Sequence, residues 1–205
     1  MSKIRKAARA DRKATHSVAK TRGTWPVRIL GGLSEAADQP PLIALAAGTI
    51  ATGAVLRRAG VVRMGARMLA SHLFATGVKT VLKTSIDRTR PAKAMRDGHH
   101  IGEGTGTEES DLNSFPSGHT AGAVAIAQAV ARDRPGAALP ARMLAGAAAA
   151  IQMPRGKHYI SDVLAGAAIG WASERVASAA LQAGERGLRR AWASYAVPKM
   201  NSEPT

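Results

Sequence analysis

The sequence predicts an all-α fold, a single membrane-embedded bundle of about five to six core helices. Hydrophobic residues make up 45% of the 205-residue chain but aromatic residues only 3%, and much of the apolar content is alanine. Small side chains let helices pack closely, whereas strands favour β-branched and aromatic residues. Apolar segments also alternate with short charged or proline-containing breaks, which is typical of helices joined by loops.

Charge and cysteine content narrow the classes of function. Lys and Arg number 29 against 14 Asp and Glu, which gives a net charge of +15 at pH 7. Such a charge suits an anionic partner, whether nucleic acid, acidic lipid or phosphate. The chain has no cysteine, which excludes a disulfide framework, a thiolate metal site and a cysteine nucleophile.

Residues 1–28 read as a basic tail that we expect to be disordered. They hold nine basic side chains and one acid, Asp11, without an apolar run. A cleaved secretory signal needs such a run, and none precedes Gln39. The segment from Trp25 to Asp38 is interrupted by charges and is predicted to lie at a membrane interface.

The helical bundle is predicted over residues 29–184, followed by a basic C-terminal tail over 185–205. The stretch from Gln39 to Leu56 holds 18 uncharged residues, which is the lower limit for a membrane-spanning helix. Residues 92–113 are polar and rich in glycine, which indicates a surface loop. Five apolar segments predict the core helices: 39–56, 68–82, 117–131, 139–153 and 161–181.

The distribution of arginine predicts how the bundle lies in the membrane. The loops at 57–67 and 132–142 and the tail after 185 are basic, and alternation of the helices places them on one side, which is then cytoplasmic. The loops at 83–117 and 154–161 meet at the opposite, extracytoplasmic end. We therefore expect a multi-pass protein of a cell inner membrane. Because the hydropathy of the segments is marginal, a soluble helical bundle is the alternative.

The first candidate site motif is Pro116-Ser117-Gly118-His119, directly before an apolar run. Ser117 is suited to cap a helix, whose first-turn amides bind anions, and Gly118 lets a ligand approach the backbone. His119 then lies beside the anion, where it can donate a proton to a leaving oxygen. The structural alternative is an ordinary capped helix with an incidental histidine.

The second motif is the pair His158 and Asp162, four residues apart. On a helix this spacing lets the carboxylate accept a hydrogen bond from the imidazole, whose other nitrogen is then available as a base, nucleophile or metal ligand. A third metal ligand is not evident, so we expect no metal. A simple His–Asp pair at a helix end is the alternative.

The third motif is the pair Lys83 and Arg90, seven residues apart and followed by a proline. That spacing is close to two helical turns, so both cations can face one direction and bind a phosphate dianion. Taken alone, the motif also fits a basic helix end. His99 and His100 lie near acidic residues of the 92–113 segment, where a solvated loop is favoured over a metal cluster.

Taken together and in this order, the three motifs resemble those of the type-2 phosphatidic acid phosphatase superfamily, which shares its fold with vanadium haloperoxidases. The resemblance spans residues 83 to 162. It implies that His158 is a nucleophile that forms a phosphohistidine, that Asp162 orients it, and that His119 protonates the leaving group. It also implies a set of groups that bind the phosphoryl oxygens: Lys83, Arg90, Ser117 and Gly118.

The chain departs from the family pattern in the motif that contains His158 and Asp162, which in the family is Ser-Arg-x5-His-x3-Asp. Here the Ser-Arg positions are Ile151 and Gln152. Either Arg155, three residues away, or Gln152 itself replaces the missing arginine, and the sequence leaves both open.

The resemblance implies a phosphatase that acts on a lipid-linked phosphate or diphosphate, of the polyprenyl diphosphate, phosphatidic acid or phosphatidylglycerol phosphate type. Fixed cations and helix-start amides can compensate the phosphoryl charge, so we expect no metal or cofactor, and no nucleic-acid partner. A neutral nucleophile and a protonated acid predict a bell-shaped pH profile. The alternatives are a vanadate-dependent haloperoxidase and a basic protein that binds membrane or nucleic acid without catalysis. For an enzyme, activity is expected to survive removal of residues 1–22.

Overall fold

The computed structural model describes residues 3–106 and 109–196, and it confirms the all-α prediction. Five helices form the bundle and correspond to the five apolar segments of the sequence. They are α3 (Gln39–Val55), α4 (Ala59–Ser85), α6 (Gly118–Asp133), α7 (Ala138–Ala150) and α8 (Ile160–Ala196).

Helix α4 begins nine residues before the predicted segment at Met68. The reason is that Arg67, which the prediction left in a charged loop, is buried inside the helix and forms an ion pair with Asp133 of α6. A paired charge is tolerated in a helical interior, whereas hydropathy counts it as a break.

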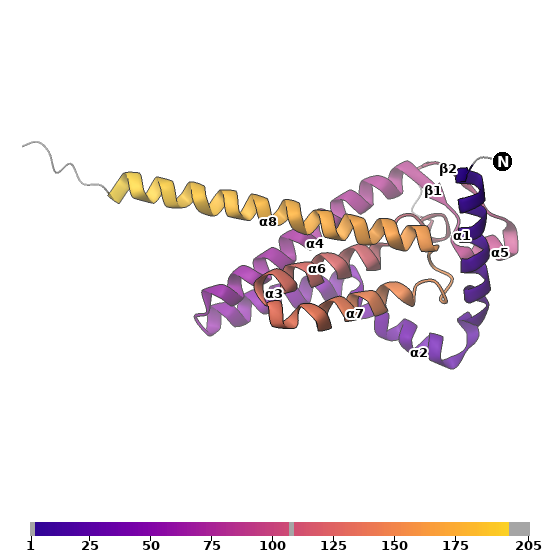
Figure 1. The fold of residues 1–205 in the computed structure, drawn as a ribbon, viewed down its shortest axis with the longest axis horizontal. Helices are drawn as coiled ribbons and strands as arrows, with labels where there is room; N and C mark the ends of the chain where they lie inside the picture. The colour runs from indigo at the N-terminus through magenta and orange to yellow at the C-terminus, as the bar shows by residue number, and fades with distance from the viewer. Residues whose placement is uncertain (1–2, 107–108, 197–205) are drawn as a thin grey trace, which may run out of the picture.

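Figure 1 shows the five bundle helices running along a common direction, with α8 extending well beyond the others. Helix α6 packs against α4, α7 and α8, and α3 packs on α4. Glycine makes the closest approach possible, because a Cβ atom at Gly166 of α8 would lie 2.5 Å from the carbonyl oxygen of Ser117. Small residues thus set the spacing between α6 and α8.

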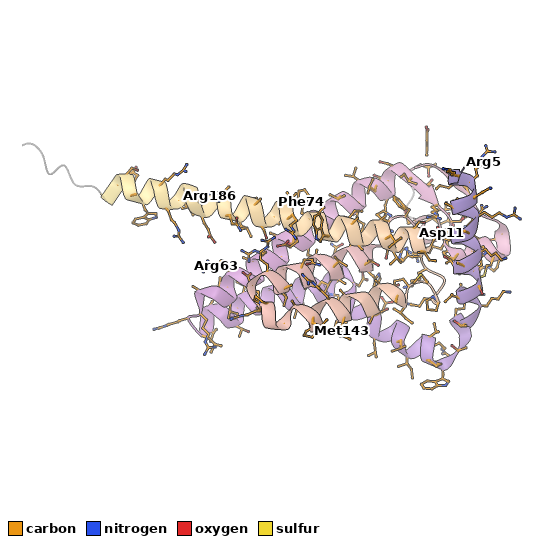
Figure 2. The ribbon with its side chains drawn as sticks, in the orientation of Figure 1. Arg5, Asp11, Arg63, Phe74, Met143 and Arg186 are labelled. Atoms are coloured by element: carbon orange, nitrogen blue, oxygen red, sulfur yellow. The ribbon has the colours of Figure 1, made fainter. Side chains whose placement is uncertain are left out.

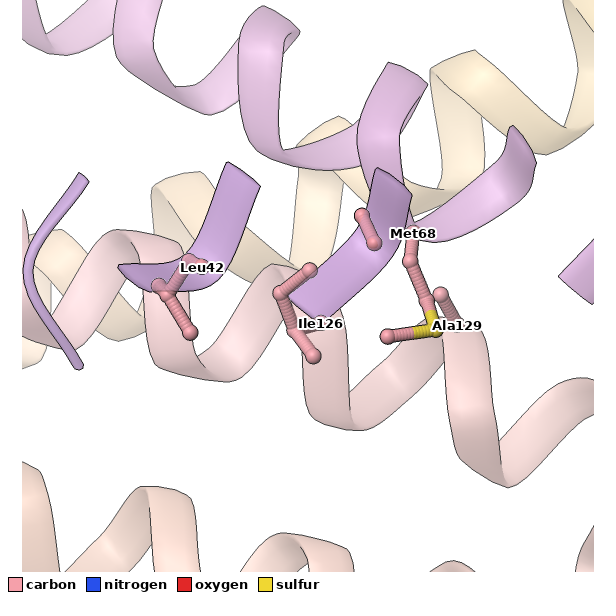
Figure 3. Close-up of a cluster of buried hydrophobic side chains, with 5 residues drawn as sticks. Leu42, Met68, Ile126 and Ala129 are labelled. Carbon is pink, nitrogen blue, oxygen red and sulfur yellow. The ribbon is translucent and has the colours of Figure 1, made fainter. Parts of the chain in front are cut away.

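The hydrophobic core is small and rich in alanine. One cluster joins α3, α4 and α6 and is shown in Figure 3. Its buried members are Leu42, Ala46, Met68, Ile126 and Ala129.

The N-terminal region differs from the expected disordered tail over residues 1–28. Helix α1 (Lys3–Ala19) lies across one end of the bundle (Figure 1) and packs against α5 and α8. Its buried residues include Thr15 and Ala19, both 0% exposed. A 3-10 turn, η1 (Lys20–Gly23), leads to α2 (Trp25–Leu33) and η2 (Ser34–Ala37). A predominantly basic helix that is held by a few polar contacts leaves no hydropathy signal.

The C-terminal region also differs in part from the predicted tail over residues 185–205. Helix α8 continues through Ala196, while residues 197–205 of that tail lie outside the described residues.

The segment between α4 and α6 is more ordered than the predicted surface loop. Strand β1 (Ile86–Arg88) pairs antiparallel with β2 (Ile101–Glu103). Short helices complete the connections: α5 (Pro91–Asp97), η3 (Ser110–Leu112) and, between α6 and α7, η4 (Pro135–Ala137).

The two ends of the bundle differ in what they carry. The segments 86–117 and 151–159 lie at the same end as α1, whereas the α3–α4 and α6–α7 turns lie at the other (Figure 1). The three motifs of the sequence therefore gather at one end. Among the described helices, none combines the length and the apolar character needed to cross a membrane.

Candidate active site

The start of helix α6 has the predicted cap. The hydroxyl oxygen of Ser117 lies 3.4 Å from the backbone nitrogen of Thr120 and accepts its hydrogen bond, and the helix begins at Gly118. The Ser117 backbone N–H donates to the carbonyl oxygen of Asp162 at 3.1 Å. The first turns of α6 and α8 are therefore tied together.

His158 lies in the loop before α8 and is 3% exposed. Its Nδ1 atom is 2.6 Å from the backbone carbonyl oxygen of Ser114. Because a carbonyl oxygen can only accept, Nδ1 carries the proton and Nε2 keeps its lone pair. The imidazole is thereby held in the tautomer that a nucleophile requires.

Asp162 contacts His158 less directly than the four-residue spacing suggested. Its Oδ2 atom is 3.9 Å from Nδ1 of His158, too far for a hydrogen bond. The spacing argument assumed that both residues lie on a helix, but α8 begins only at Ile160.

The Asp162 carboxylate is fully buried and accepts hydrogen bonds from the residues that surround His158. Its Oδ2 atom accepts from the Ser114 hydroxyl at 2.6 Å and from the Tyr159 backbone N–H at 2.8 Å. Its Oδ1 atom accepts from Arg88. Ser114 thus links the two motif residues, because its hydroxyl binds Asp162 and its carbonyl binds His158.

Three sequence-distant groups surround His158. Burial, followed by the charges of Lys83 and Arg90 and a smaller contribution from His119, lowers the pKa of His158 well below its ordinary value of 6.5, against the hydrogen bond to Ser114. His158 is therefore neutral at neutral pH. Residues of all three motifs therefore lie near one imidazole.

The two cations of the third motif are positioned by the loop before α6. Lys83 donates from Nζ to the backbone oxygen of Asn113 at 2.6 Å, and the Arg90 backbone N–H donates to the Asp111 carbonyl at 2.8 Å. The Nε atom of Arg90 is buried without a hydrogen-bond partner among the described residues. A buried unpaired guanidinium nitrogen is suited to receive an anion.

His119 faces a carboxylate from η2. Its Nε2 atom lies 3.4 Å from Oε2 of Glu35. Glu35 also accepts from Arg155, and from Lys157 at 3.2 Å. Burial opposes ionisation, but these hydrogen bonds outweigh it and lower the pKa of Glu35 to about 2.

Glu35, Asp38 and His119 have ligand atoms within 4.8 Å of one another, so this group of described residues could hold a metal ion. Glu35 already pairs with two cations, however, and a metal would compete with both.

The two candidates for the missing arginine of the His158–Asp162 motif have different surroundings. Gln152 is fully buried, and its amide donates to the Ala148 carbonyl at 2.8 Å and to the Ser34 hydroxyl oxygen at 3.3 Å. Arg155 lies close enough to Arg90 for its charge to lower the pKa of that residue, after the effect of burial. Arg155 also donates to the Ser34 hydroxyl at 2.7 Å. Both side chains therefore meet at Ser34, and of the two Arg155 brings a positive charge close to Arg90.

The sequence model of the PAP2 superfamily matches residues 64–185, more than half of the chain. The chain belongs to this superfamily. All three motifs lie inside the matched region, and this PAP2 protein is therefore a hydrolase of phosphoric monoesters. No curated protein sequence matches it significantly.

Two solved structures share the fold of this PAP2 protein. One is the first transmembrane PAP2-type phosphatidylglycerolphosphate phosphatase from Bacillus subtilis, with 21% identity, 86% of each chain covered and a TM-score of 0.66. The other is Aquifex aeolicus LpxE, with 19% identity, coverage of 80% of this chain and 92% of that one, and a TM-score of 0.61.

Several residues at the site of this PAP2 protein were not singled out from the sequence. Ser114 lies two residues before Pro116, Lys157 directly precedes His158, and Arg88 lies between Lys83 and Arg90, so their closeness to the motifs was the available signal. Glu35 lies far upstream and carried no signal.

Gly118 lies against the side chain of a lysine from α4. A Cβ atom there would lie 2.8 Å from Cδ of Lys79, so the glycine accommodates a lysine stem from α4. Lys79 is one helical turn before Lys83, which adds another cation to this face of α4.

Proposed function

We propose that this protein is a metal-independent phosphatase that hydrolyses a lipid-linked phosphate or diphosphate through a phosphohistidine intermediate. The observation that carries the proposal is the hydrogen bond from Nδ1 of His158 to the Ser114 carbonyl, which leaves Nε2 as a nucleophile beside Lys83 and Arg90.

In the first step, Nε2 of His158 attacks phosphorus in line with the leaving oxygen. The N–P bond forms, the P–O bond breaks, and protonated His119 gives its proton to the leaving oxygen. Water then attacks the phosphohistidine, neutral His119 takes a proton from it, and phosphate leaves as Nε2 is restored.

Charge on the phosphoryl oxygens is compensated by fixed groups of the chain. The cations are Lys83, Arg90 and Arg155, and the Gly118 amide at the start of α6 adds a hydrogen-bond donor. The Ser117 amide, which the sequence also suggested, is already bound to the Asp162 carbonyl. Burial lowers the pKa of His119, and the carboxylates of Asp38 and Glu35 oppose this effect. Nε2 of His119 lies 3.4 Å from Glu35, which can accept its hydrogen bond when the imidazole is protonated. No step requires a metal.

An apolar groove beside the site supports a lipid substrate. It has a volume of about 370 Å³ and runs between η2, α3, α6 and α7. Its lining includes Leu42, Ile126 and Leu144, and it also includes Ser34, the hydroxyl that Arg155 binds. A head group at the cations can therefore continue into an apolar chain in the groove. The neighbour from Bacillus subtilis is itself named as a phosphatidylglycerolphosphate phosphatase.

Exposed apolar side chains support a membrane location. On α2, Trp25, Ile29 and Leu33 follow one another at four-residue spacing and are 73%, 55% and 67% exposed. An apolar helix face of this kind lies well in a membrane interface. The bundle helices also expose large apolar side chains: Leu45, Leu73, Phe74, Val81, Leu144, Leu164 and Trp171.

The positions of the charged residues support a multi-pass protein of the inner membrane with its site on the extracytoplasmic face. Arg63 and Arg186 lie at the end of the molecule opposite Asp11 and the site (Figure 2). Basic residues in the turns between spanning helices favour the cytoplasmic side, and on that rule we place the site end outward, although the basic helix α1 with Arg5 also lies at the site end.

Phosphate release from a panel of phosphatidic acid, phosphatidylglycerol phosphate and polyprenyl diphosphate tests the proposal, with chelator present throughout. His158→Ala should abolish release and His119→Ala should reduce it strongly. His100→Ala, which removes an exposed imidazole near the site, is the matched control and should leave release unchanged. Normal turnover by the His158→Ala variant would show that His158 is not the nucleophile. Halide oxidation that requires vanadate, in place of phosphate release that vanadate inhibits, would favour a haloperoxidase.

A further inference from the structure

We propose that Asp11 and Thr15 of helix α1 are positioning residues for the nucleophile: they cap α8 from outside and hold Arg88 against Asp162. The inference rests on the proposed function, because it concerns the loop and helix start that orient His158. It assigns a role in catalysis to a segment that the sequence presents as a basic tail.

At the start of helix α8, the helix's own Asp162 accepts the Tyr159 N–H, and the N–H groups of Ile160 and Ser161 need other acceptors. The first backbone N–H groups of a helix need acceptors, and the residue before Ile160 is Tyr159, which is not a capping residue. Helix α1 supplies them instead. The Ile160 N–H donates to the Thr15 hydroxyl oxygen at 3.3 Å, and the Ser161 N–H donates to Oδ1 of Asp11 at 3.3 Å.

The second oxygen of Asp11 anchors a buried charge. Oδ2 accepts from the Ser161 hydroxyl at 2.5 Å and from Nη2 of Arg88 at 3.2 Å. The other terminal nitrogen of Arg88 donates to Asp162 and, at 2.8 Å, to the Ser161 hydroxyl oxygen. Arg88 is 7% exposed, and its guanidinium lies 4.0 Å from the centre of the Tyr159 ring.

These contacts form one continuous chain of polar groups that ends at the imidazole. Asp11 binds Arg88, Arg88 binds Asp162, Asp162 accepts from the Ser114 hydroxyl, and the Ser114 carbonyl binds Nδ1 of His158. In such a buried network each member fixes the geometry of the next. Losing Asp11 leaves Arg88 with a single carboxylate and removes one of the two caps of α8.

The residues of α1 are arranged for this contact. Asp11, Thr15 and Ala19 are spaced four apart, so they share one face, and the side chain of Asp11 is only 14% exposed. Figure 2 shows Asp11 on the side of α1 toward the start of α8. Asp11 is also the only acid in α1, whose basic residues are mostly exposed.

The phosphate-binding cations are held independently of α1, since Lys83 binds the Asn113 backbone and Arg155 binds η2. Loss of Asp11 should therefore slow the chemical step and leave substrate binding almost intact. Because α1 contributes to the site, removal of residues 1–22 should reduce activity, which reverses the expectation drawn from the sequence.

The test compares Asp11→Asn, Asp11→Glu and Thr15→Val with the wild-type full chain, using phosphatidic acid in detergent micelles. Asp11→Asn should lower kcat by about 10- to 100-fold, the range seen when a partner that orients an active group is lost, and should leave KM within about twofold. Thr15→Val should cause a smaller loss of kcat. Asp11→Glu keeps the carboxylate and should recover part of the activity. Arg9→Gln, an exposed change on the same helix, is the control and should match wild type.

The melting temperature and a His158→Ala variant are measured in parallel. If Asp11→Asn lowers the melting temperature but leaves kcat per folded molecule unchanged, the contact is structural only and the inference is overturned. An equal loss in Asp11→Asn and Asp11→Glu also overturns it. If His158→Ala remains active, the proposed function fails, whatever the Asp11 variants show.

Discussion

The backbone carbonyl oxygen of Ser114 lies 2.6 Å from Nδ1 of His158, and this contact decides which imidazole nitrogen is free to react. The hydroxyl of the same serine donates to Asp162 at 2.6 Å. Ser114, which lies outside the three motifs, thus connects His158 and Asp162.

We predict that Ser114→Ala lowers kcat by about 10-fold, because the main-chain carbonyl remains but its link to Asp162 is lost. The free energy of unfolding should fall by about 1–3 kcal/mol, since a buried carboxylate loses a donor. Steady-state kinetics and thermal unfolding measure the two effects. Ser110→Ala, an exposed serine in the same segment, should change neither. Full activity in Ser114→Ala would show that the carbonyl alone positions the imidazole.

Variants of Arg155 and Gln152 are predicted to differ in KM. Arg155→Gln should raise KM for a lipid phosphate by about 10-fold or more, because a fixed cation of the site is lost. Gln152→Leu should leave KM unchanged, since this side chain is directed to Ala148 and Ser34. The reverse pattern would show that Gln152, and not Arg155, takes the place of the missing arginine.

The acid limb of the pH profile reports on His158. Burial and the charges of Lys83 and Arg90, together with His119, lower its pKa, so kcat/KM should stay high below pH 6.5 and fall only in more acidic solution. A cation disfavours the imidazolium, so removing one raises this pKa. Arg90→Gln should therefore move the acid limb to higher pH, on top of a lower kcat/KM. A profile that is flat from mildly acidic to mildly alkaline pH would contradict the assigned roles.

Close packing of α6 and α8 gives a prediction about stability. In Gly166→Ala the new methyl group collides with the Ser117 carbonyl oxygen, at the point where α8 packs against the start of α6. We expect a loss of about 1–3 kcal/mol in the free energy of unfolding and a lower kcat. Gly184→Ala in the same helix has open space around it and should be neutral or slightly stabilising. Equal stability of the two variants would show that α8 can shift without cost.

The sequence was sufficient for the bundle and for the grouping of the motifs. Alanine-rich segments with charged breaks predicted five helices, and Ser117 before an apolar run predicted the start of α6 to the residue. These signals are local, since they depend on hydropathy and on capping chemistry. The common location of Lys83, Arg90, His119 and His158 followed from the order of the helices and from the family resemblance.

What the sequence did not predict depends on tertiary contacts. Helix α1 is held by Asp11 and Thr15, two polar residues that look ordinary until α8 is placed beside them. Arg67 interrupts the apolar run of the sequence but not helix α4, because Asp133 of another helix pairs with its charge. The four-residue spacing of His158 and Asp162 suggested a direct contact, but helix α8 starts between them.

The length of α8 has a practical consequence. With 37 residues it measures roughly 55 Å, and its C-terminal part projects from the bundle (Figure 1). Leu188, Trp192 and Tyr195 on that part are 66%, 74% and 90% exposed. A fluorophore or a surface tether attached to this part of α8 lies far from both imidazoles. The enzyme can therefore be immobilised or labelled there while turnover is recorded.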